Sequence, residues 1–147
     1  MTATAGALDT VADTGGDIAF GGSRVLGSGF FLEPTAVVGP ADTDPALTDE
    51  IFGPVLVVQP FDSVYELLPR ANGGRYGLTA GVWTTDVRKA HAVSHQLQAG
   101  TVWVNTFADY NAAAPFGGFK GSGVGKDCGP EGLDKCLQTQ TVWMSLS

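Results

Sequence analysis

The sequence predicts an α/β domain built on a mostly parallel sheet with crossover helices. Three short runs of apolar, β-branched or aromatic residues occur at 55–58, 79–84 and 102–104, and each has the length and composition of a strand. Between them lie two segments with apolar residues at helical spacing. This β-α-β-α-β order implies right-handed crossovers, and it places ligand sites at the carboxyl ends of the strands.

The first strand is expected at Val55–Val58, where four consecutive apolar residues indicate a strand buried on both faces. Asp62 or Ser63 can cap the helix that follows. Ser63 also forms a capping-box pattern with Glu66, three residues later. Pro69 should kink this helix or end it early, because proline lacks the backbone N–H of a helix interior.

The second strand is expected within 79–84, after a turn at Tyr76. Thr85 or Asp86 can cap a second helix that runs to about Gln98, and Gly100 suits the stop of that helix. The third strand follows immediately at 102–104. Four further elements complete the prediction: an extended segment at 30–38, an acidic loop at 41–49, a short helix at 130–137 and a final strand at 139–144.

Composition limits the classes of protein and partner. The chain has 147 residues, of which 44% are apolar, which suits one domain with a single core. Eight Lys and Arg against fifteen Asp and Glu give a net charge of −7, so no nucleic-acid partner is expected. No apolar run approaches the ~20 residues of a membrane span, and residues 1–16 lack the features of a signal peptide. A cytoplasmic protein without a membrane partner is expected, with Cys128 and Cys136 as free thiols.

Two motifs suggest ligand sites but fit them poorly. The glycine-rich loop at 117–126 matches neither a P-loop nor a dinucleotide fingerprint, because Lys120 and Lys126 stand where those patterns need glycine. A tight structural turn is the favoured interpretation. His91 and His95 have a spacing that could chelate zinc, but no third ligand is evident. A solvated helix face is favoured there, and neither a metal site nor a catalytic residue is predicted in this chain.

Two other segments are better candidates for binding. Glu50 and Phe52 precede a strand, where the carboxylate could accept hydrogen bonds from a ribose diol and the ring could pack beside a flat cofactor. The alternative is a capping residue followed by a core Phe. Phe107, Tyr110 and Phe116 follow the third strand and could line an apolar substrate funnel. The alternative for these rings is an ordinary aromatic mini-core.

Taken in order, these pieces resemble the C-terminal part of the aldehyde dehydrogenase superfamily from about Leu8 onward. The motifs that carry the resemblance are Phe31-Leu32-Glu33-Pro34-Thr35, Glu50-Ile51-Phe52-Gly53-Pro54-Val55, Tyr76-Gly77-Leu78, Ala99-Gly100-Thr101-Val102-Trp103-Val104-Asn105, Pro115-Phe116-Gly117-Gly118 with Lys120, Ser122, Gly123 and Gly125, and Glu131-Gly132-Leu133. The implied fold is a truncated aldehyde dehydrogenase catalytic domain at 17–138, after a poorly matched segment at 1–16 and before an oligomerisation strand at 139–147.

In that family a cysteine thiolate attacks the aldehyde, hydride passes to the nicotinamide, and water hydrolyses the thioester. The resemblance implies a partial site for NAD or NADP, in which Glu50 binds the ribose of the nicotinamide half and Phe52 lies at the nicotinamide end. The implied aldehyde-binding residues are Asn105, which shapes the loop, and Phe107, Tyr110 and Phe116, which line the funnel.

Some positions depart from the family pattern, including Lys126-Asp127, where arginine and glutamate are usual, Cys136 and Gln140. More important, the family's nucleophilic cysteine, general-base glutamate, oxyanion-hole asparagine and dinucleotide-binding domain all lie upstream of the matched region. The chain is therefore expected to be a C-terminal fragment that is inactive alone. A gene relic, one half of a split enzyme and a regulatory module all remain open. The alternative function is a non-enzymatic binding or association module that pairs with a full-length or split dehydrogenase, or with itself as a homo-oligomer.

Overall fold

The computed structural model describes residues 3–147, so the first two residues of the segment at 1–16 lie outside the described part. The chain divides into two compact units, Met1–Arg70 and Ala71–Ser147, which are described separately below. None of the helices within 3–147 has both the length and the apolar composition that crossing a membrane requires.

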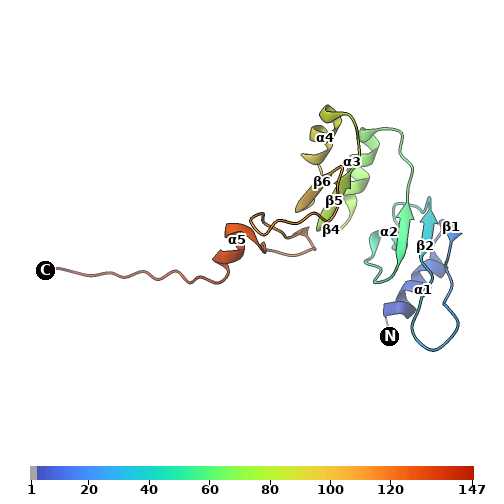
Figure 1. Cartoon of the computed structure of the whole chain (residues 1–147), viewed down its shortest axis with the longest axis horizontal. Helices are drawn as coiled ribbons and strands as arrows, with labels where there is room; N and C mark the ends of the chain where they lie inside the picture. The colour runs from blue at the N-terminus through green and yellow to red at the C-terminus, as the bar shows by residue number, and fades with distance from the viewer. Residues whose placement is uncertain (1–2) are drawn as a thin grey trace. The chain divides into compact units, whose positions relative to one another are not determined.

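The first unit contains a three-stranded sheet in the order β1 (Asp17–Phe20), β2 (Thr35–Val38) and β3 (Val55–Val58), drawn in blue to green in Figure 1. β1 runs antiparallel to β2, whereas β2 and β3 are parallel and in continuous register. Helix α1 (Ala3–Asp13) precedes the sheet and was not predicted. Its buried residues Ala7 and Val11 share the core of this unit with the inner residues of β2.

The expectation that the strand at Val55–Val58 is buried on both faces is wrong for the described chain. Burial alternates along β3, and Leu56 is 61% exposed. The continuous apolar run is typical of a strand in a sheet that is covered on both sides. In the described residues only one side of β3 is covered, so the second face of the strand remains accessible.

The acidic connection between β2 and β3 contains a short helix, α2 (Pro45–Thr48), where the sequence predicted only loop. Asp44 caps this helix by accepting a hydrogen bond from the Ala46 N–H at 2.8 Å. The same carboxylate accepts bonds from the Gly15 N–H at 2.8 Å and from the Thr14 hydroxyl at 3.1 Å. The sequence signal for this helix was Asp44 followed by Pro45, because aspartate is favoured at the N-cap and proline at the first helical position.

These bonds make the unfolding free energy depend on pH. Asp44 is 8% exposed, and the backbone N–H groups of Gly15 and Ala46 lower the pKa of its carboxyl below the ordinary value of 3.8. A group with a lowered folded pKa stabilises the fold above its unfolded pKa and loses that stabilisation as the pH falls through the folded pKa. Asp44→Asn should therefore be less stable than the parent at pH 7, and the difference should shrink as the pH falls below 3.8. Urea denaturation at a series of pH values would measure this. A difference independent of pH would contradict it.

Helix α3 (Val64–Gly73) begins with one of the two bonds of the predicted capping box, and the second goes to Asp62 instead of Ser63. The Glu66 N–H donates to the Ser63 hydroxyl at 3.2 Å, and the Glu66 carboxylate accepts from the Asp62 N–H at 3.2 Å. Of the two effects predicted for Pro69, an early end of the helix is wrong, since α3 continues to Gly73, and a kink stays a prediction. The proline removes one bond to the carbonyl of Tyr65, which lies on the exposed side of the helix where water can replace it.

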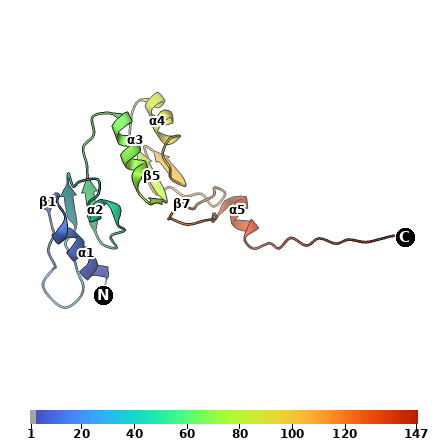
Figure 2. The same ribbon diagram turned by 180° about the vertical axis from the view of Figure 1, so that it is seen from behind.

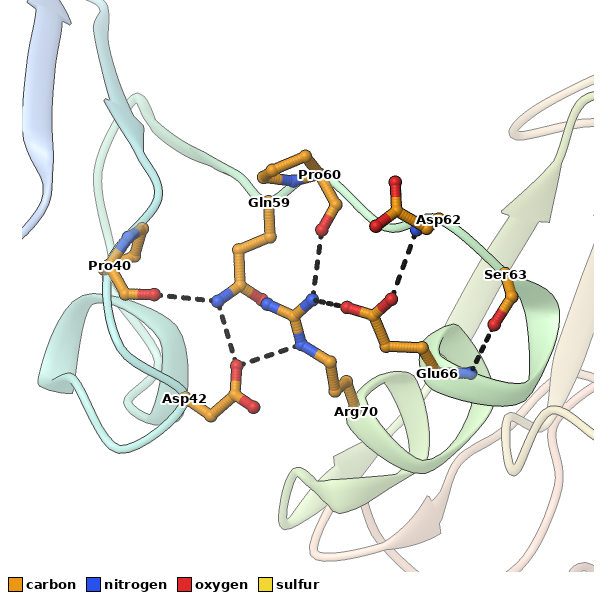
Figure 3. A network of polar contacts seen from close by, with 8 residues as sticks. All are labelled: Pro40, Asp42, Gln59, Pro60, Asp62, Ser63, Glu66 and Arg70. Atoms are coloured by element: carbon orange, nitrogen blue, oxygen red, sulfur yellow. Dashed lines mark hydrogen bonds and ion pairs between the residues drawn. The ribbon is translucent and has the colours of Figure 1, made fainter.

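A polar network around Arg70 connects α3 to the segment after β2 (Figure 3). The guanidinium pairs with Asp42 at 3.0 Å through Nε and with Glu66 at 3.1 Å through Nη1. Gln59 donates to the same Asp42 carboxylate at 3.1 Å and to the Pro40 carbonyl at 2.9 Å. Because the network is partly solvated, each ion pair alone contributes little to the free energy of unfolding. Together the bonds hold Pro40 and Asp42, at the start of the β2–β3 connection, in place.

The second unit contains two small sheets. β5 (Thr79–Val82) and β6 (Thr101–Val104) are parallel, and β4 (Tyr76–Gly77) pairs antiparallel with β7 (Phe119–Lys120). Helix α4 (Val87–Ser94) connects β5 to β6 and lies beside both strands (Figures 1 and 2). A last helix, α5 (Gly129–Asp134), follows β7. The parallel pairs β2–β3 and β5–β6 confirm the predicted mixed α/β class with parallel strands, although the parallel strands belong to separate sheets.

Asp86 caps α4 as predicted, by accepting bonds from the Arg88 and Lys89 N–H groups. The predicted end near Gln98 is wrong, because the helix stops at Ser94. The side chain of Asn72 explains the difference: its amide donates to the Gln96 carbonyl at 2.9 Å and accepts from the Gln98 N–H at 2.8 Å. These tertiary bonds hold the backbone at 96–98 outside the helix. Residues 138–147 form no strand in the described chain, so the predicted oligomerisation strand stays a prediction.

Candidate functional site

The first candidate site lies on the turn that leads into β3. The Gly53 N–H donates to the Ile51 carbonyl at 2.8 Å, and the Val55 N–H donates to the Gly53 carbonyl at 2.8 Å. This tight backbone carries Phe52 outward, so its side chain is 71% exposed. The alternative interpretation of Phe52 as a core residue is therefore wrong. Glu50, just before the turn, is also exposed.

Phe52 borders a hollow of about 220 Å³ that is lined largely by aromatic and apolar side chains. The lining residues are Phe30, Phe31, Leu32, Phe52, Gly53 and Pro54. Apolar walls of this kind suit a flat ring, because offset or edge-on contacts between rings are favourable. Phe30 and Phe31 were not predicted as site residues. Their signals were their place in the extended segment at 30–38 and, for Phe31, its place in a motif that carries the family resemblance.

The second candidate site is an aromatic cluster built on Trp103 of β6. Trp103 is 7% exposed, and its indole N–H donates to the Asp109 carbonyl at 2.9 Å. Its ring contacts Phe107 and Tyr110 edge-on, with centroids 5.0 and 5.5 Å away. Tyr110 in turn contacts Phe116 edge-on at 5.2 Å. The structure thus brings the three predicted rings together.

The cluster has a packed side and an open side. Phe107 and Tyr110 rest on buried Trp103 but are themselves exposed over more than half of their surface. Trp83 at the end of β5 extends the row, with its ring centroid 6.4 Å from that of Phe107. Neither tryptophan was predicted as a site residue, although Trp103 lies in the strand directly before the loop. The arrangement combines both interpretations, since the same rings form a mini-core and an accessible apolar wall.

Asn105 fixes the direction in which the aromatic loop leaves β6. Its side-chain carbonyl accepts from the Thr84 N–H at 2.9 Å, and its amide donates to the Thr84 carbonyl at 2.9 Å. Its own N–H donates to the Val82 carbonyl at 2.8 Å. The backbone of Asn105 has φ 55°, a left-handed conformation that asparagine tolerates better than most residues. These bonds agree with the predicted loop-shaping role. A direct substrate contact by Asn105 stays a prediction.

Removing this amide clamp should destabilise the second unit. Asn105→Ala loses both bonds to Thr84 and strains the left-handed backbone, and we expect the unfolding free energy to fall by about 1–3 kcal/mol. Asn105→Gly loses the same bonds without the strain, so it should lie between the parent and the alanine variant. Urea denaturation followed by tryptophan fluorescence would measure all three. Equal stability of the parent and Asn105→Gly would mean that the clamp contributes nothing.

An open groove of about 550 Å³ lies where the carboxyl ends of β5 and β6 meet the start of α4, between Trp83, Val87 and Val104. Its position agrees with the expectation that ligand sites in this fold lie at the carboxyl ends of parallel strands. The clamp between Asn105 and Thr84 forms part of its wall. The bonds between Asn105 and Thr84 therefore stabilise both the wall of the groove and the start of the aromatic loop.

The two lysines of the glycine-rich loop donate to backbone carbonyls. Lys126 donates to the Gly117 and Gly118 carbonyls at 2.8 and 3.3 Å. Lys120 bonds the carbonyls of Asn72 and Gly74, the first at 2.6 Å. Ammonium groups engaged in this way stabilise the loop rather than a bound anion, which agrees with the structural turn predicted from the sequence.

Cys128 and Cys136 are free thiols, as predicted, and both are exposed. Within the described residues 3–147, no group of three or more His, Cys, Asp and Glu side chains is placed to hold a metal ion.

Fold and sites together define an α/β protein with parallel strands, an aromatic hollow sized for a flat ring and an apolar wall at the strand ends. The chain matches the model of the aldehyde dehydrogenase family over residues 2–142. It belongs to the aldehyde dehydrogenase family.

Individual relatives agree with this assignment. Betaine aldehyde dehydrogenase of Vibrio vulnificus is 43% identical over 145 residues, which are 96% of this chain and 30% of that protein. Cytosolic 10-formyltetrahydrofolate dehydrogenase of Xenopus laevis is 46% identical over 130 residues, which are 87% of this chain and 14% of that protein. The chain thus spans less than a third of the length of these relatives.

Solved structures agree as well. The NAD+ complex of aldehyde dehydrogenase from Bacillus cereus superposes with a TM-score of 0.91 and 42% identity, covering 99% of this chain and 30% of that one. An NAD+ complex of indole-3-acetaldehyde dehydrogenase has a TM-score of 0.90 and 38% identity, covering 98% of this chain and 30% of that one. Both matches extend over nearly the whole chain, and both structures contain NAD+.

Proposed function

We propose that this chain supplies residues to the cofactor site and residues to the aldehyde site of an NAD(P)-dependent aldehyde dehydrogenase. In this proposal Glu50 binds the ribose hydroxyls of the nicotinamide half, and Phe52 packs against the nicotinamide. Phe107, Tyr110 and Phe116 guide the aldehyde. The observation that carries the proposal is the outward position of Phe52 beside an aromatic hollow, in a chain of this family.

The residues present fit the nicotinamide end of the cofactor. A hollow of about 220 Å³ can receive one small planar ring, which could pack against the Phe52 side chain at its border. The exposed Glu50 carboxylate, two residues from Phe52, has acceptor sites for both hydroxyls of a ribose diol. When bound, the cofactor supplies the hydride acceptor. The part of this chain is to bind and orient that ring and to keep water from its apolar side.

The aromatic cluster fits the aldehyde side. Tyr110 and Phe107 each present one exposed flank while the opposite flank rests on Trp103, so the rings are held in place without being covered. A rigid apolar wall binds a substrate with a small loss of side-chain entropy. We infer that this wall selects aldehydes with an apolar or aromatic substituent.

We further propose that the 147 residues alone do not oxidise aldehydes. The resemblance places the nucleophilic cysteine and its general base in sequence upstream of the matched region, and Cys128 and Cys136 do not match the family's nucleophile position. Loss of a nucleophile and its base removes most of the catalytic acceleration of an enzyme that uses covalent catalysis.

A chimeric enzyme tests these proposals together. The matching 30% of the Bacillus cereus enzyme is replaced by this chain, and NADH formation is followed with aliphatic and aromatic aldehydes. We expect the isolated chain to be inactive and the chimera to be active. Glu50→Gln and Phe52→Ala should raise the KM for NAD+ about tenfold, and Tyr110→Ala should raise the KM for the aldehyde. Val124→Ala, at a 99% exposed position, is the matched control and should change neither value.

Two outcomes would overturn the assignment. Turnover by the isolated chain would show that the reactive groups lie within it. An active chimera whose KM for NAD+ is unchanged in Glu50→Gln and Phe52→Ala would remove these residues from the cofactor site.

A second candidate, an association module, rests on the C-terminal segment 138–147. Val142, Met144 and Leu146 alternate with smaller or polar residues except at Trp143, and all four side chains are largely exposed. This pattern suits a strand that pairs with the edge of another sheet. Sedimentation of the intact chain and of a chain ending at residue 137 would test it. Equal masses per particle for the two would exclude self-association through this segment.

A further inference from the structure

Two histidines lie on one exposed face at the C-terminal end of α4. His91 is in the last turn of the helix, and His95 is its capping residue, with helical φ and ψ of −71° and −21°. The His95 N–H still donates to the His91 carbonyl at 3.1 Å, so the helical i, i+4 geometry holds across the pair. Both side chains are exposed. Their rings face each other, with centroids 6.2 Å apart and planes 18° from parallel.

We propose that His91 and His95 form a two-histidine site for a first-row transition-metal dication. Residues four apart on a helix have Cβ atoms about 5–6 Å apart, and metal–nitrogen bonds to imidazole are about 2.0–2.1 Å. Small rotations of two exposed side chains bring one nitrogen of each ring onto the same ion. Water completes the coordination, since no third protein ligand is placed there among the described residues.

The place of the pair on the helix favours a cation. The C-terminal end of a helix carries partial negative charge from its unpaired carbonyl groups, which stabilises positive charge within the last turn. His91 and His95 are in that turn, whereas the cationic Arg88 and Lys89 are in the first turn of α4. Two neutral nitrogen ligands with open positions suit Cu²⁺ best, then Ni²⁺, with Zn²⁺ below Cu²⁺ in the same series.

This site is independent of the proposed dehydrogenase function. It uses neither Glu50 and Phe52 nor the aromatic cluster on Trp103. The sequence alone favoured a solvated helix face, because no third ligand was evident. In the structure the helical backbone extends to His95 and the two ring centroids are 6.2 Å apart, close enough for side-chain rotation to turn one nitrogen of each ring toward a shared ion.

Copper titration of the whole untagged chain tests the proposal. Cys128→Ser and Cys136→Ser are introduced first, so that the exposed thiols do not bind the metal. Cu²⁺ binding is measured by calorimetry, and electron paramagnetic resonance counts the coordinated nitrogens. We expect one site with two imidazole nitrogens and an affinity at least about tenfold higher than in His91→Gln or His95→Gln. Far-ultraviolet circular dichroism of each variant verifies that the fold is kept.

The matched control keeps two histidines but changes their spacing. In the double variant His95→Gln with Gln96→His, the pair is five residues apart and no longer on one face of the helix. We expect this control to bind Cu²⁺ as weakly as the single variants. Parent-like affinity in the control, parent-like affinity in either single variant, or a spectrum with a single imidazole nitrogen in the parent would each overturn the proposal.

Discussion

Gly100→Ala is expected to destabilise the second unit strongly. A Cβ at position 100 would collide with the carbonyl oxygen of Gly117. That oxygen cannot move aside freely, because it accepts the Lys126 ammonium at 2.8 Å. The Gly100 N–H also donates to the Gly77 carbonyl at 3.0 Å, which fixes the chain from the other side. We expect a loss of about 3 kcal/mol or more, the upper end of overpacking effects.

Thermal denaturation would measure this effect. For a unit of this size, 3 kcal/mol corresponds to a decrease in Tm of about 12 °C or more. Gly73→Ala is the matched control, because a Cβ there meets no atom within 4 Å. The control should keep the parent Tm or raise it slightly, since alanine favours a helix more than glycine does. A parent-like Tm in Gly100→Ala would contradict the close backbone crossing.

Trp103→Ala should have the second large effect. The substitution empties a buried position and removes the indole bond to the Asp109 carbonyl. Truncation of a buried tryptophan costs about 3–5 kcal/mol. Phe107 and Tyr110 lose the ring on which they rest, so the near-ultraviolet circular dichroism of the aromatic loop should also weaken.

Urea denaturation of Trp103→Ala and Trp143→Ala distinguishes this effect from a general loss of aromatic surface. Trp143 is 93% exposed, so its truncation should change the unfolding free energy by no more than about 0.5 kcal/mol. Equal losses in the two variants would show that Trp103 does not support the loop. In Trp103→Phe, which keeps a ring but not the N–H donor, we expect an intermediate loss.

The elements that the sequence predicted well are those with a local cause. Val55–Val58 and Thr101–Val104 are short β-branched or aromatic runs, and both are strands. Ser63 and Asp86 cap helices because their side-chain oxygens reach nearby backbone N–H groups. Such signals depend on a few neighbouring residues, so they can be read directly from the chain.

The errors come from contacts between distant residues. Asn72 binds the backbone near Gln96 and shortens α4, although 24 residues separate the two. Leu56 is 61% exposed, although the continuous apolar run predicted a strand buried on both faces. Pairing partners and cover are properties of the whole fold, and hydrophobic periodicity does not encode them.

The candidate sites divide in the same way. The rings of Phe107, Tyr110 and Phe116 could be proposed from their position after a strand, and they do form one cluster. Their support by Trp103 and the clamp made by Asn105 needed coordinates, because both depend on side-chain orientation. The role of Glu50 came from family resemblance, since an exposed glutamate before a turn has no distinctive pattern of its own.

The hydrogen bonds of Lys126 have a consequence for surface chemistry. An amine reacts with an acylating reagent through its unprotonated lone pair, and the ammonium of Lys126 donates to two carbonyls while lying 4.9 Å from the centroid of the Phe119 ring. Lys89, on the exposed surface of α4, has ordinary access to solvent. We therefore expect acylation to favour Lys89 over Lys126, and modification of Lys126 would remove its bonds to the Gly117 and Gly118 carbonyls.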